Sequence, residues 1–359
     1  MRGAALPLLL AAASGCAGLR PPPPALQLPG ETLEVSRQDL DLLAKNDEEL
    51  YAVGQAARQA GDHRRAAAAL GRLADRFPES RRREAALAEA GRAHLALGEW
   101  RPALQRFEAL ARAAAGPGAD EATFEAAACH HLLGERAEAQ ALLAGLLARG
   151  DLAPAARVRA LTERGVLELE AGALDAAGRS LEEALDLADR AQATERLGDE
   201  PPAKAHYWMG ELLRARFAAA PLDLAAGEEA VAEALERKGD LLLAAQAHYL
   251  RASRRGSPAF GVAGVVRVGE LYESLHAQLS GAVPPPGLSP DEAAAWREEL
   301  EAQLSVLVHK AVAAYEEAIA AARARGLDPS LVEDAARALE RLKALLLSRQ
   351  ERPGADPAR

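Results

Sequence analysis

Four glycines recur at an almost constant interval, and this spacing restricts the fold more than any other feature of the chain. The intervals are 37, 36 and 38 residues, between Gly61, Gly98, Gly134 and Gly172. After each glycine an alanine follows five residues later and a large apolar residue nine residues later, and a small residue lies seven residues before it. Self-similarity at a fixed period of roughly 20–50 residues indicates one supersecondary unit stacked many times.

The spacing predicts a helix, a glycine turn and a second, antiparallel helix. Glycine takes the left-handed cap conformation at little cost, so it ends the first helix. We expect the small residue of the first helix to leave room for the second helix, whose alanine faces it. The large apolar residue then fills the layer between neighbouring units. Helix-forming Ala and Leu dominate the chain and aromatic residues are 4%, which favours an all-α fold.

The phrases QAGDHRRAAAAL, ALGEWRPALQRF, LLGERAEAQALL and EAGALDAAGRSL resemble the tetratricopeptide repeat. This resemblance implies an all-α, right-handed α-solenoid of tetratricopeptide-like helical hairpins, with about four repeats over residues 37–190. The units are a few residues longer than is usual for the family, which is similar to the bacterial envelope variety of the repeat. The alternative is a generic Ala-rich helical bundle.

For residues 191–349 the sequence predicts a C-terminal module of degenerate tetratricopeptide-like hairpins with longer helices. Helical segments are expected at 203–218, 224–254 and 258–279, and Gly239-Asp240 is either a turn or a kink. Ser289, Pro290 and Glu292 form a capping box that opens a long helix. Its predicted buried stripe is Trp296, Leu300, Leu304, Val308, Ala311, Tyr315 and Ile319. A final helix is expected to Leu347, and residues 350–359 are predicted to be disordered.

About 100 residues of this module are similar to the C-terminal part of large tetratricopeptide envelope lipoproteins of myxobacteria and other deltaproteobacteria. The stretches that carry the similarity are VGELYESLHAQLSGAVPPPGLSPDEAAAWREELEAQ and VHKAVAAYEEAIAAARARGL. Some of those lipoproteins belong to the gliding-motility machinery.

The first 36 residues read as an export signal and a spacer. A single arginine, Arg2, precedes an apolar run too short to span a bilayer, and Ala13, Ser14 and Gly15 stand directly before Cys16. This arrangement resembles a bacterial lipobox, which implies a signal peptide at residues 1–16 and lipidation of Cys16. The alternative is an Ala-rich cytosolic N-terminus. Residues 17–36 contain four consecutive prolines, which favour an extended tether.

No catalytic or cofactor-binding pattern stands out. The formal net charge of −10 disfavours nucleic-acid binding. Cys129, His130 and His131 are adjacent on a predicted helix, where side chains diverge by about 100° per residue, so we predict no metal site there. Gly261 and Gly264 do not have dinucleotide-binding spacing. We therefore predict no enzyme activity, no small-molecule cofactor and no nucleic-acid partner.

The predicted function is a protein–protein interaction scaffold, because stacked hairpins create a groove lined by their first helices. The candidate groove residues are Tyr51, Gln55, Arg58, Arg92, Phe124, His131, Thr162 and Val166. The alternative for them is burial against a following helix. We expect a periplasm-facing lipoprotein of the cell envelope, with the outer membrane favoured, that braces an envelope complex. An accessory protein that positions a cell-wall enzyme or glycan, and a cytosolic adaptor, remain alternatives.

Overall fold

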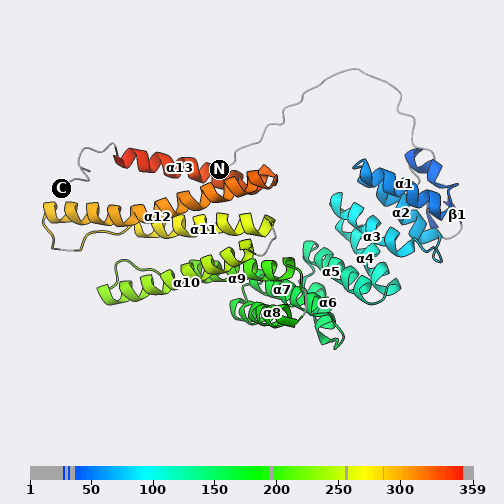
Figure 1. Ribbon diagram of the computed structural model, residues 1–359, viewed down its shortest axis with the longest axis horizontal. Coiled ribbons are helices and arrows are strands. Elements are labelled where there is room, and N and C mark those ends of the chain that lie inside the picture. The colour runs from blue at the N-terminus through cyan, green and yellow to red at the C-terminus, as the bar shows by residue number, and fades with distance from the viewer. Residues whose placement is uncertain are drawn as a thin grey trace, which may run out of the picture. The chain divides into compact units, whose positions relative to one another are not determined.

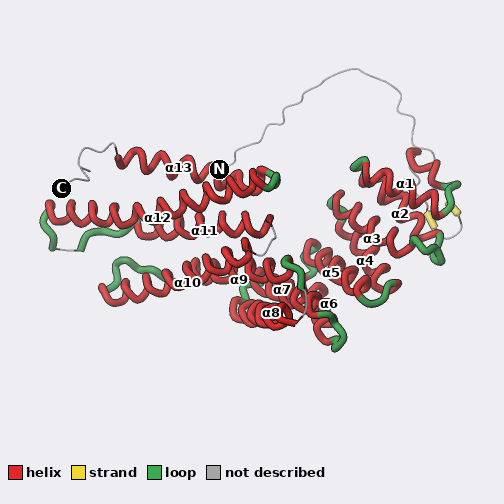
Figure 2. The backbone as a smooth tube through the Cα atoms, viewed as in Figure 1, coloured by secondary structure: helices red, strands yellow, loops and turns green. Residues whose placement is uncertain are grey.

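A computed structural model of the chain describes residues 27–28, 31–32, 37–194, 197–254, 258–285 and 287–350. Helices account for most of these residues (Figure 2). The predicted signal peptide, Cys16 and residues 351–359 of the predicted tail lie outside the described residues, whereas residue 350, the first of that tail, is the last residue of a helix. No helix in the described part is long and apolar enough to cross a bilayer. The chain divides into two compact units, residues 1–93 and 94–359.

The first unit begins with a minimal antiparallel ladder between β1 (Gln27–Leu28) and β2 (Glu31–Thr32). These four residues fall inside the segment predicted as an extended tether, so that part of it is paired backbone instead. The 3₁₀ helix η1 (Arg37–Leu42) leads to the first hairpin, α1 (Asp47–Gln59) and α2 (His63–Arg76). Helix α3 (Arg83–Ala96) spans the boundary between the units.

The second unit is a series of helices in which each packs on its neighbour in the chain (Figure 1). The shorter helices are α4 (Trp100–Ala113), α5 (Pro117–Leu132), α6 (Arg136–Ala148), α7 (Pro154–Glu170) and α8 (Leu174–Thr194). The longer module follows with α9 (Glu200–Ala219), α10 (Glu228–Arg254), α11 (Pro258–Leu279) and α12 (Pro290–Ala324). It closes with η2 (Pro329–Val332) and α13 (Glu333–Gln350).

The predicted all-α stack of helical hairpins is confirmed, and so are its glycine turns. Gly61, Gly98, Gly134 and Gly172 have φ values of 75°, 72°, 77° and 77°. After each of them, the next residue donates its backbone N–H to the carbonyl five residues earlier, as in the bond from Glu135 to His130 at 2.8 Å. This 6→1 hydrogen bond satisfies a carbonyl that the end of the first helix would leave unpaired.

The small residues have a different neighbour from the predicted one. A Cβ atom placed on Gly54 would lie 2.5 Å from Cγ of Leu70, and one on Gly165 would lie 2.8 Å from Cγ of Leu181. The large apolar residue of the second helix is therefore the nearest neighbour of both glycines, and the predicted alanine approaches Gly165 only through the Ala177 carbonyl oxygen at 3.5 Å. The reason is the direction of the side chain: a long residue in a helix points back toward its N-terminus, over the preceding turn.

The C-terminal helices lie close to the predicted segments, and α10 runs without interruption through Gly239-Asp240. The predicted capping box of α12 is present, with the Ser289 hydroxyl accepting from the Glu292 N–H at 3.3 Å. Trp296 and Leu300, which were predicted to be buried, are only half-buried. They lie in the N-terminal part of α12, residues 290–303, where no side chain is buried. The buried stripe of α12 starts at Leu304.

Candidate functional site

The first helices of successive hairpins in the second unit form one surface. Helix α7 contacts α5 and α9, and α9 contacts α11 (Figure 1). Each of these helices turns its small residue toward a second helix. Residues whose side chains lie about 100–160° around the helix axis from that small residue therefore face away from the second helices. We call this side the first-helix face.

Ion pairs connect each first helix to the next across this face. Arg159 of α7 pairs with Glu121 of α5 at 2.5 Å. Lys204 of α9 pairs with Glu163 of α7, and Arg267 of α11 pairs with Glu211 of α9 at 3.2 Å. In these three pairs the cation belongs to the later helix and the carboxylate to the earlier one.

The same order is found at the last helix that the structure describes. Arg341 of α13 pairs with Glu273 of α11 at 2.6 Å. We call the four pairs the charge ladder. Most of its side chains are partly exposed, so each pair contributes little free energy of unfolding, about 0.2–1 kcal/mol. Their shared geometry nevertheless favours one register between adjacent hairpins.

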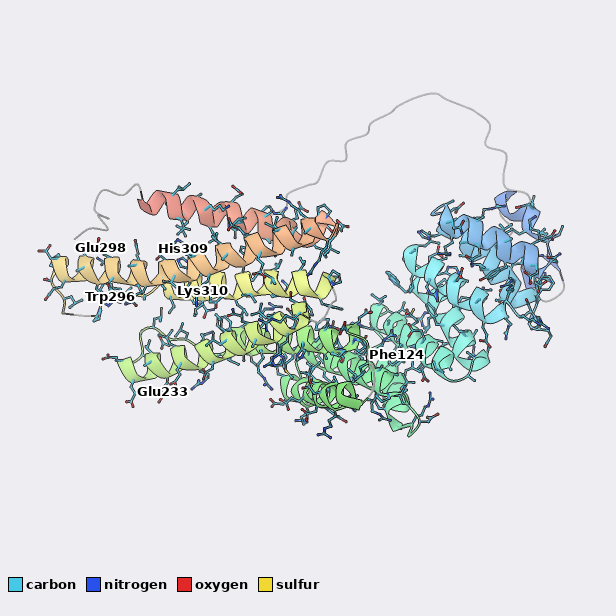
Figure 3. All side chains as sticks on the ribbon, in the orientation of Figure 1. Phe124, Glu233, Trp296, Glu298, His309 and Lys310 are labelled. Carbon is cyan, nitrogen blue, oxygen red and sulfur yellow. The ribbon has the colours of Figure 1, made fainter. Side chains whose placement is uncertain are left out.

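Three of the predicted groove residues are buried in this unit and do not line an open groove. Phe124 is 4% exposed (Figure 3), Thr162 is 0% exposed and Val166 is 5% exposed. The guanidinium of Arg159 lies 4.3 Å above the centre of the Phe124 ring. The Thr162 hydroxyl donates to the Val158 carbonyl at 2.8 Å. All three side chains are buried, in line with the alternative that the sequence left open, and Phe124 packs against residues of the following hairpin.

The four predicted groove residues of the first unit remain at least partly exposed to solvent. Tyr51 lies beneath the Arg82 guanidinium, at 4.8 Å from the ring centre. Gln55 donates to Glu89 at 2.6 Å, and Arg58 pairs with the same carboxylate at 3.5 Å. Arg92 is exposed. Their role in binding a partner stays a prediction.

The His131 side chain is half-buried and its Nε2 lies 2.5 Å from Glu170 of α7. His130 places Nδ1 at 2.7 Å from Glu135. Cys129 is 0% exposed, and burial raises the pKa of its thiol to about 11. No group of three or more His, Cys, Asp or Glu side chains among the described residues is arranged to hold a metal ion.

A polar cluster on α9 and α11 was missed by the sequence reasoning. Glu211 is 7% exposed and accepts hydrogen bonds from the Tyr249 hydroxyl at 2.8 Å and from Arg214 at 2.6 Å. Arg267 also donates to Glu270 at 2.7 Å. Burial, together with the Glu211 charge, raises the pKa of Tyr249, so its hydroxyl stays protonated and continues to donate. The cluster fixes α9, α10 and α11 together while leaving the two guanidinium groups about one-third exposed.

A repeated phrase could have identified this cluster. Gly-Glu-Leu occurs at 210–212 and again at 269–271. A Cβ on Gly210 would lie 2.5 Å from the Tyr249 ring, and a Cβ on Gly269 would collide with the Tyr315 ring. Tyr315 in turn donates to Glu273 at 3.0 Å. The packing of the glycine against the tyrosine of the following second helix therefore recurs, whereas the acid that accepts from the tyrosine is one residue after the glycine in the first case and four residues after it in the second.

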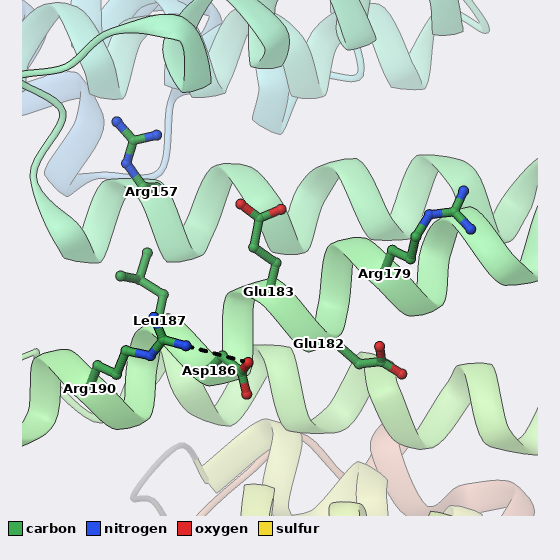
Figure 4. Close-up of a pocket in the computed structure, with 7 residues that line it drawn as sticks. All are labelled: Arg157, Arg179, Glu182, Glu183, Asp186, Leu187 and Arg190. Carbon is green, nitrogen blue, oxygen red and sulfur yellow. Dashed lines mark ion pairs between the residues drawn. The ribbon is translucent and has the colours of Figure 1, made fainter.

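A charged hollow of about 410 Å³ lies along α7 and α8 (Figure 4). Its lining is almost entirely charged: Arg157, Arg179, Glu182, Glu183, Asp186, Leu187 and Arg190. Three arginines face three carboxylates, and one of these pairs joins Arg190 and Asp186 at 3.9 Å. The opposite charges compensate one another within the hollow, so it does not select a charged ligand of either sign.

Comparisons with known proteins give remote likenesses of fold. No protein-family model matches the sequence, and no curated protein matches it either. The chain is similar to the crystal structure of MamA protein, with 15% identity and a TM-score of 0.38 over 55% of this chain and 91% of that one. It is also similar to a tetratricopeptide repeat protein from Parabacteroides merdae, with 14% identity and a TM-score of 0.38 over 82% of this chain and 98% of that one.

A third similar structure is the APC/C hetero-tetramer Cut9-Hcn1, with 15% identity and a TM-score of 0.45. That match covers 83% of this chain and 44% of the other. These likenesses are remote, and it is the helix pairing of the chain itself that establishes the stack of tetratricopeptide-like hairpins.

Proposed function

We propose that this chain is a non-catalytic scaffold that holds a partner protein on its first-helix face. The observation that carries the proposal is the continuous row of first helices, α5, α7, α9 and α11, joined by the charge ladder. Such a surface is formed before the partner arrives, so binding needs little reorganisation of the backbone. Extended surfaces of this kind are the usual binding sites of helical repeat proteins.

Leu132 is the best candidate for an apolar anchor on this face. It is 53% exposed, although large apolar side chains are usually buried. Its spacing of four residues from Ala128 and eleven from Glu121 places all three on one side of α5. An exposed apolar side chain beside charged groups has the composition expected of an interface.

The titratable groups of the first-helix face support a structural role rather than a chemical one. Glu121, Glu163 and Glu211 each face a cation of the next helix. We therefore assign these groups to packing and partner recognition.

We further propose that the protein works in the cell envelope, as a periplasm-facing lipoprotein held at the outer membrane through Cys16. The support is the lipobox-like sequence before Cys16 and the proline-rich segment after it. The similarity of the C-terminal module to myxobacterial envelope lipoproteins favours a complex for motility or secretion.

The test is crosslinking in intact bacterial cells, followed by affinity purification of the full-length protein and mass spectrometry. We expect several envelope proteins in a stable ratio from the wild type, and their loss from Leu132→Arg. Leu347→Arg on α13 is the matched control, because Leu347 is 59% exposed and its helix is not one of the row α5, α7, α9 and α11. Cys16→Ser should release the protein from the membrane.

Three results would contradict the proposal. Equal recovery of partners with Leu132→Arg and with the wild type would rule out the first-helix face. Recovery of cytosolic proteins alone would rule out the envelope and favour a cytosolic adaptor. A single cell-wall enzyme as the partner would replace the scaffold of a large complex with an enzyme accessory.

A further inference from the structure

A second surface lies on the other side of α11, between the second helices α10 and α12. Both helices contact α11, and residues from all three line a groove of about 250 Å³. Its floor is apolar and buried, and consists of Val265, Val268 and Tyr272 of α11. We call it the second-helix groove. By helix spacing its floor points away from Arg267 and Glu270, so it is separate from the first-helix face.

The walls of the groove carry apolar residues that solvent reaches. Leu250 of α10 and Ala313 of α12 line it directly. Leu243 is 58% exposed and precedes Leu250 by seven residues, which is two helical turns on the same side of α10. Val306 is 53% exposed and precedes Ala313 by the same distance on α12. The apolar strip therefore extends about 10 Å along each wall.

The groove is held in shape before any ligand binds. The Tyr272 hydroxyl donates to Oε1 of Gln246 at 2.7 Å, which ties the floor to the α10 wall. On the opposite wall, Ala313 and Ala314 are small and leave the space that a larger side chain would fill. A preformed groove with small residues on one wall accepts the ridge of another helix.

Two opposite charges on the α12 wall define what fits the groove. Lys310 lies 5.1 Å above the centre of the Tyr272 ring, and Glu317 lines the same groove. Within the described residues neither has an oppositely charged partner at ion-pair distance. They are seven residues apart, or about 10 Å along one side of α12.

We propose that the second-helix groove binds an amphipathic helix of a partner protein, about three turns long. Its apolar residues, spaced three and four apart, would cover Leu250, Val268 and Ala313. A carboxylate and a cation set two turns apart on that helix would meet Lys310 and Glu317. The apolar floor provides the affinity and the two charges select the partner and its direction.

The experiment measures binding of three synthetic helical peptides to the full chain by fluorescence anisotropy. The peptides share one apolar stripe and differ only at two positions seven residues apart, which carry Glu and Lys, Glu and Glu, or Lys and Lys. We expect the wild type to bind the Glu/Lys peptide most tightly. Lys310→Glu should shift the preference to the Lys/Lys peptide, and Glu317→Lys should shift it to the Glu/Glu peptide, each by about three- to tenfold.

Ala313→Arg should weaken the binding of all three peptides by at least about tenfold, because the arginine side chain fills the groove. The position is exposed, so the variant should fold. Glu298→Lys is the matched control for charge: Glu298 is exposed and lies further toward the N-terminal end of α12 (Figure 3). It changes the net charge as Glu317→Lys does and should leave all three affinities unchanged.

Three outcomes would overturn the proposal. One is failure of the wild type to bind any of the peptides, and another is equal binding by the wild type and Ala313→Arg. The third is a dimer of the chain alone that Ala313→Arg dissociates, which would make a second copy the occupant. Leu132 lies outside the groove, so the Leu132→Arg variant should bind the peptides as the wild type does. The second-helix groove and the first-helix face are therefore tested separately.

Discussion

Replacement of Gly210 by alanine probes the arrangement that holds the C-terminal hairpins together. The new Cβ atom would lie 2.5–2.8 Å from three atoms of the Tyr249 ring. The ring cannot move aside easily, because Tyr249 is 0% exposed and its hydroxyl is held by Glu211 at 2.8 Å. Overpacking of this kind reduces the free energy of unfolding by about 1–3 kcal/mol.

A gain from helix propensity opposes this loss. Alanine is better than glycine inside a helix by about 1 kcal/mol, so the net loss at Gly210 is about 0–2 kcal/mol. Gly239→Ala supplies the matched control. Gly239 lies within α10 and has no atom within 4 Å of a built Cβ, so only the propensity gain applies there. The two variants should therefore differ by about 1–3 kcal/mol.

The assay is urea unfolding followed by far-UV circular dichroism, with hydrogen exchange to locate the change in α9 and α10. Gly239→Ala should raise the midpoint and Gly210→Ala should lower it. In a Tyr249→Leu background Gly210→Ala should become neutral or stabilising, since the ring that it strikes is gone. Equal midpoints for the two alanine variants, or an unchanged penalty in the Tyr249→Leu background, would refute the packing argument.

Three further predictions concern turns and buried charge. Gly172→Ala should lower the free energy of unfolding, measured by urea unfolding, by about 1–2 kcal/mol, and Gly172→Asn should lower it by less. The reason is that φ of Gly172 is 77° and a new Cβ meets no other atom, so only the backbone conformation is strained. Burial, with a smaller effect of Arg251, lowers the pKa of His248 to about 4, so the unfolded chain binds more protons between pH 6.5 and 4. Wild-type stability should fall as the pH drops through that range, and the fall should be shallower in His248→Asn, as urea midpoints at several pH values will show. Burial also lowers the pKa of Lys238, whose ammonium donates to the Phe217 carbonyl at 2.7 Å, so the unfolded chain binds more protons just below pH 10.5. The wild type should gain stability relative to Lys238→Met as the pH rises toward 10.5, and equal slopes for the two proteins would contradict this.

The glycine turns were predictable because each is a local event. A positive φ at Gly98 or Gly134 depends on the residue itself and on the few residues that cap the helix. The capping box at Ser289 is equally local. Such features are set by short-range spacing, so they appear in the sequence without knowledge of the packing.

The direction of side chains between hairpins was not predictable in the same way. Phe124, Thr162 and Val166 have the spacing of groove residues, but all three are buried in the folded chain. How far one hairpin rotates over the next depends on the contacts of both, including the position of Arg159 over Phe124. The sequence of one chain shows which residues share a face of a helix. It does not show how far neighbouring hairpins are rotated relative to each other.

The glycine–tyrosine contact inside the C-terminal hairpins was missed, although their helices were predicted, because the connections between those helices vary in length. Gly54 and Leu70, like Gly165 and Leu181, are separated by 16 residues. The same contact joins Gly210 to Tyr249, 39 residues later. A search for a fixed period cannot find a contact whose two residues lie at changing distances in the chain.

The charge ladder also bears on how a chain of this kind can change in length during evolution. Helices α7, α9 and α11 each supply a cation to the first helix before them, and Arg341 of α13 follows the same order toward Glu273. The paired positions shift along the helices: Arg159 and Lys204 both lie six residues before the small residue of their helix, but Glu121 lies six and Glu163 two residues before theirs. A duplicated hairpin would therefore carry charges of the right sign in the wrong register, so each addition to the stack needs a substitution at its new neighbour.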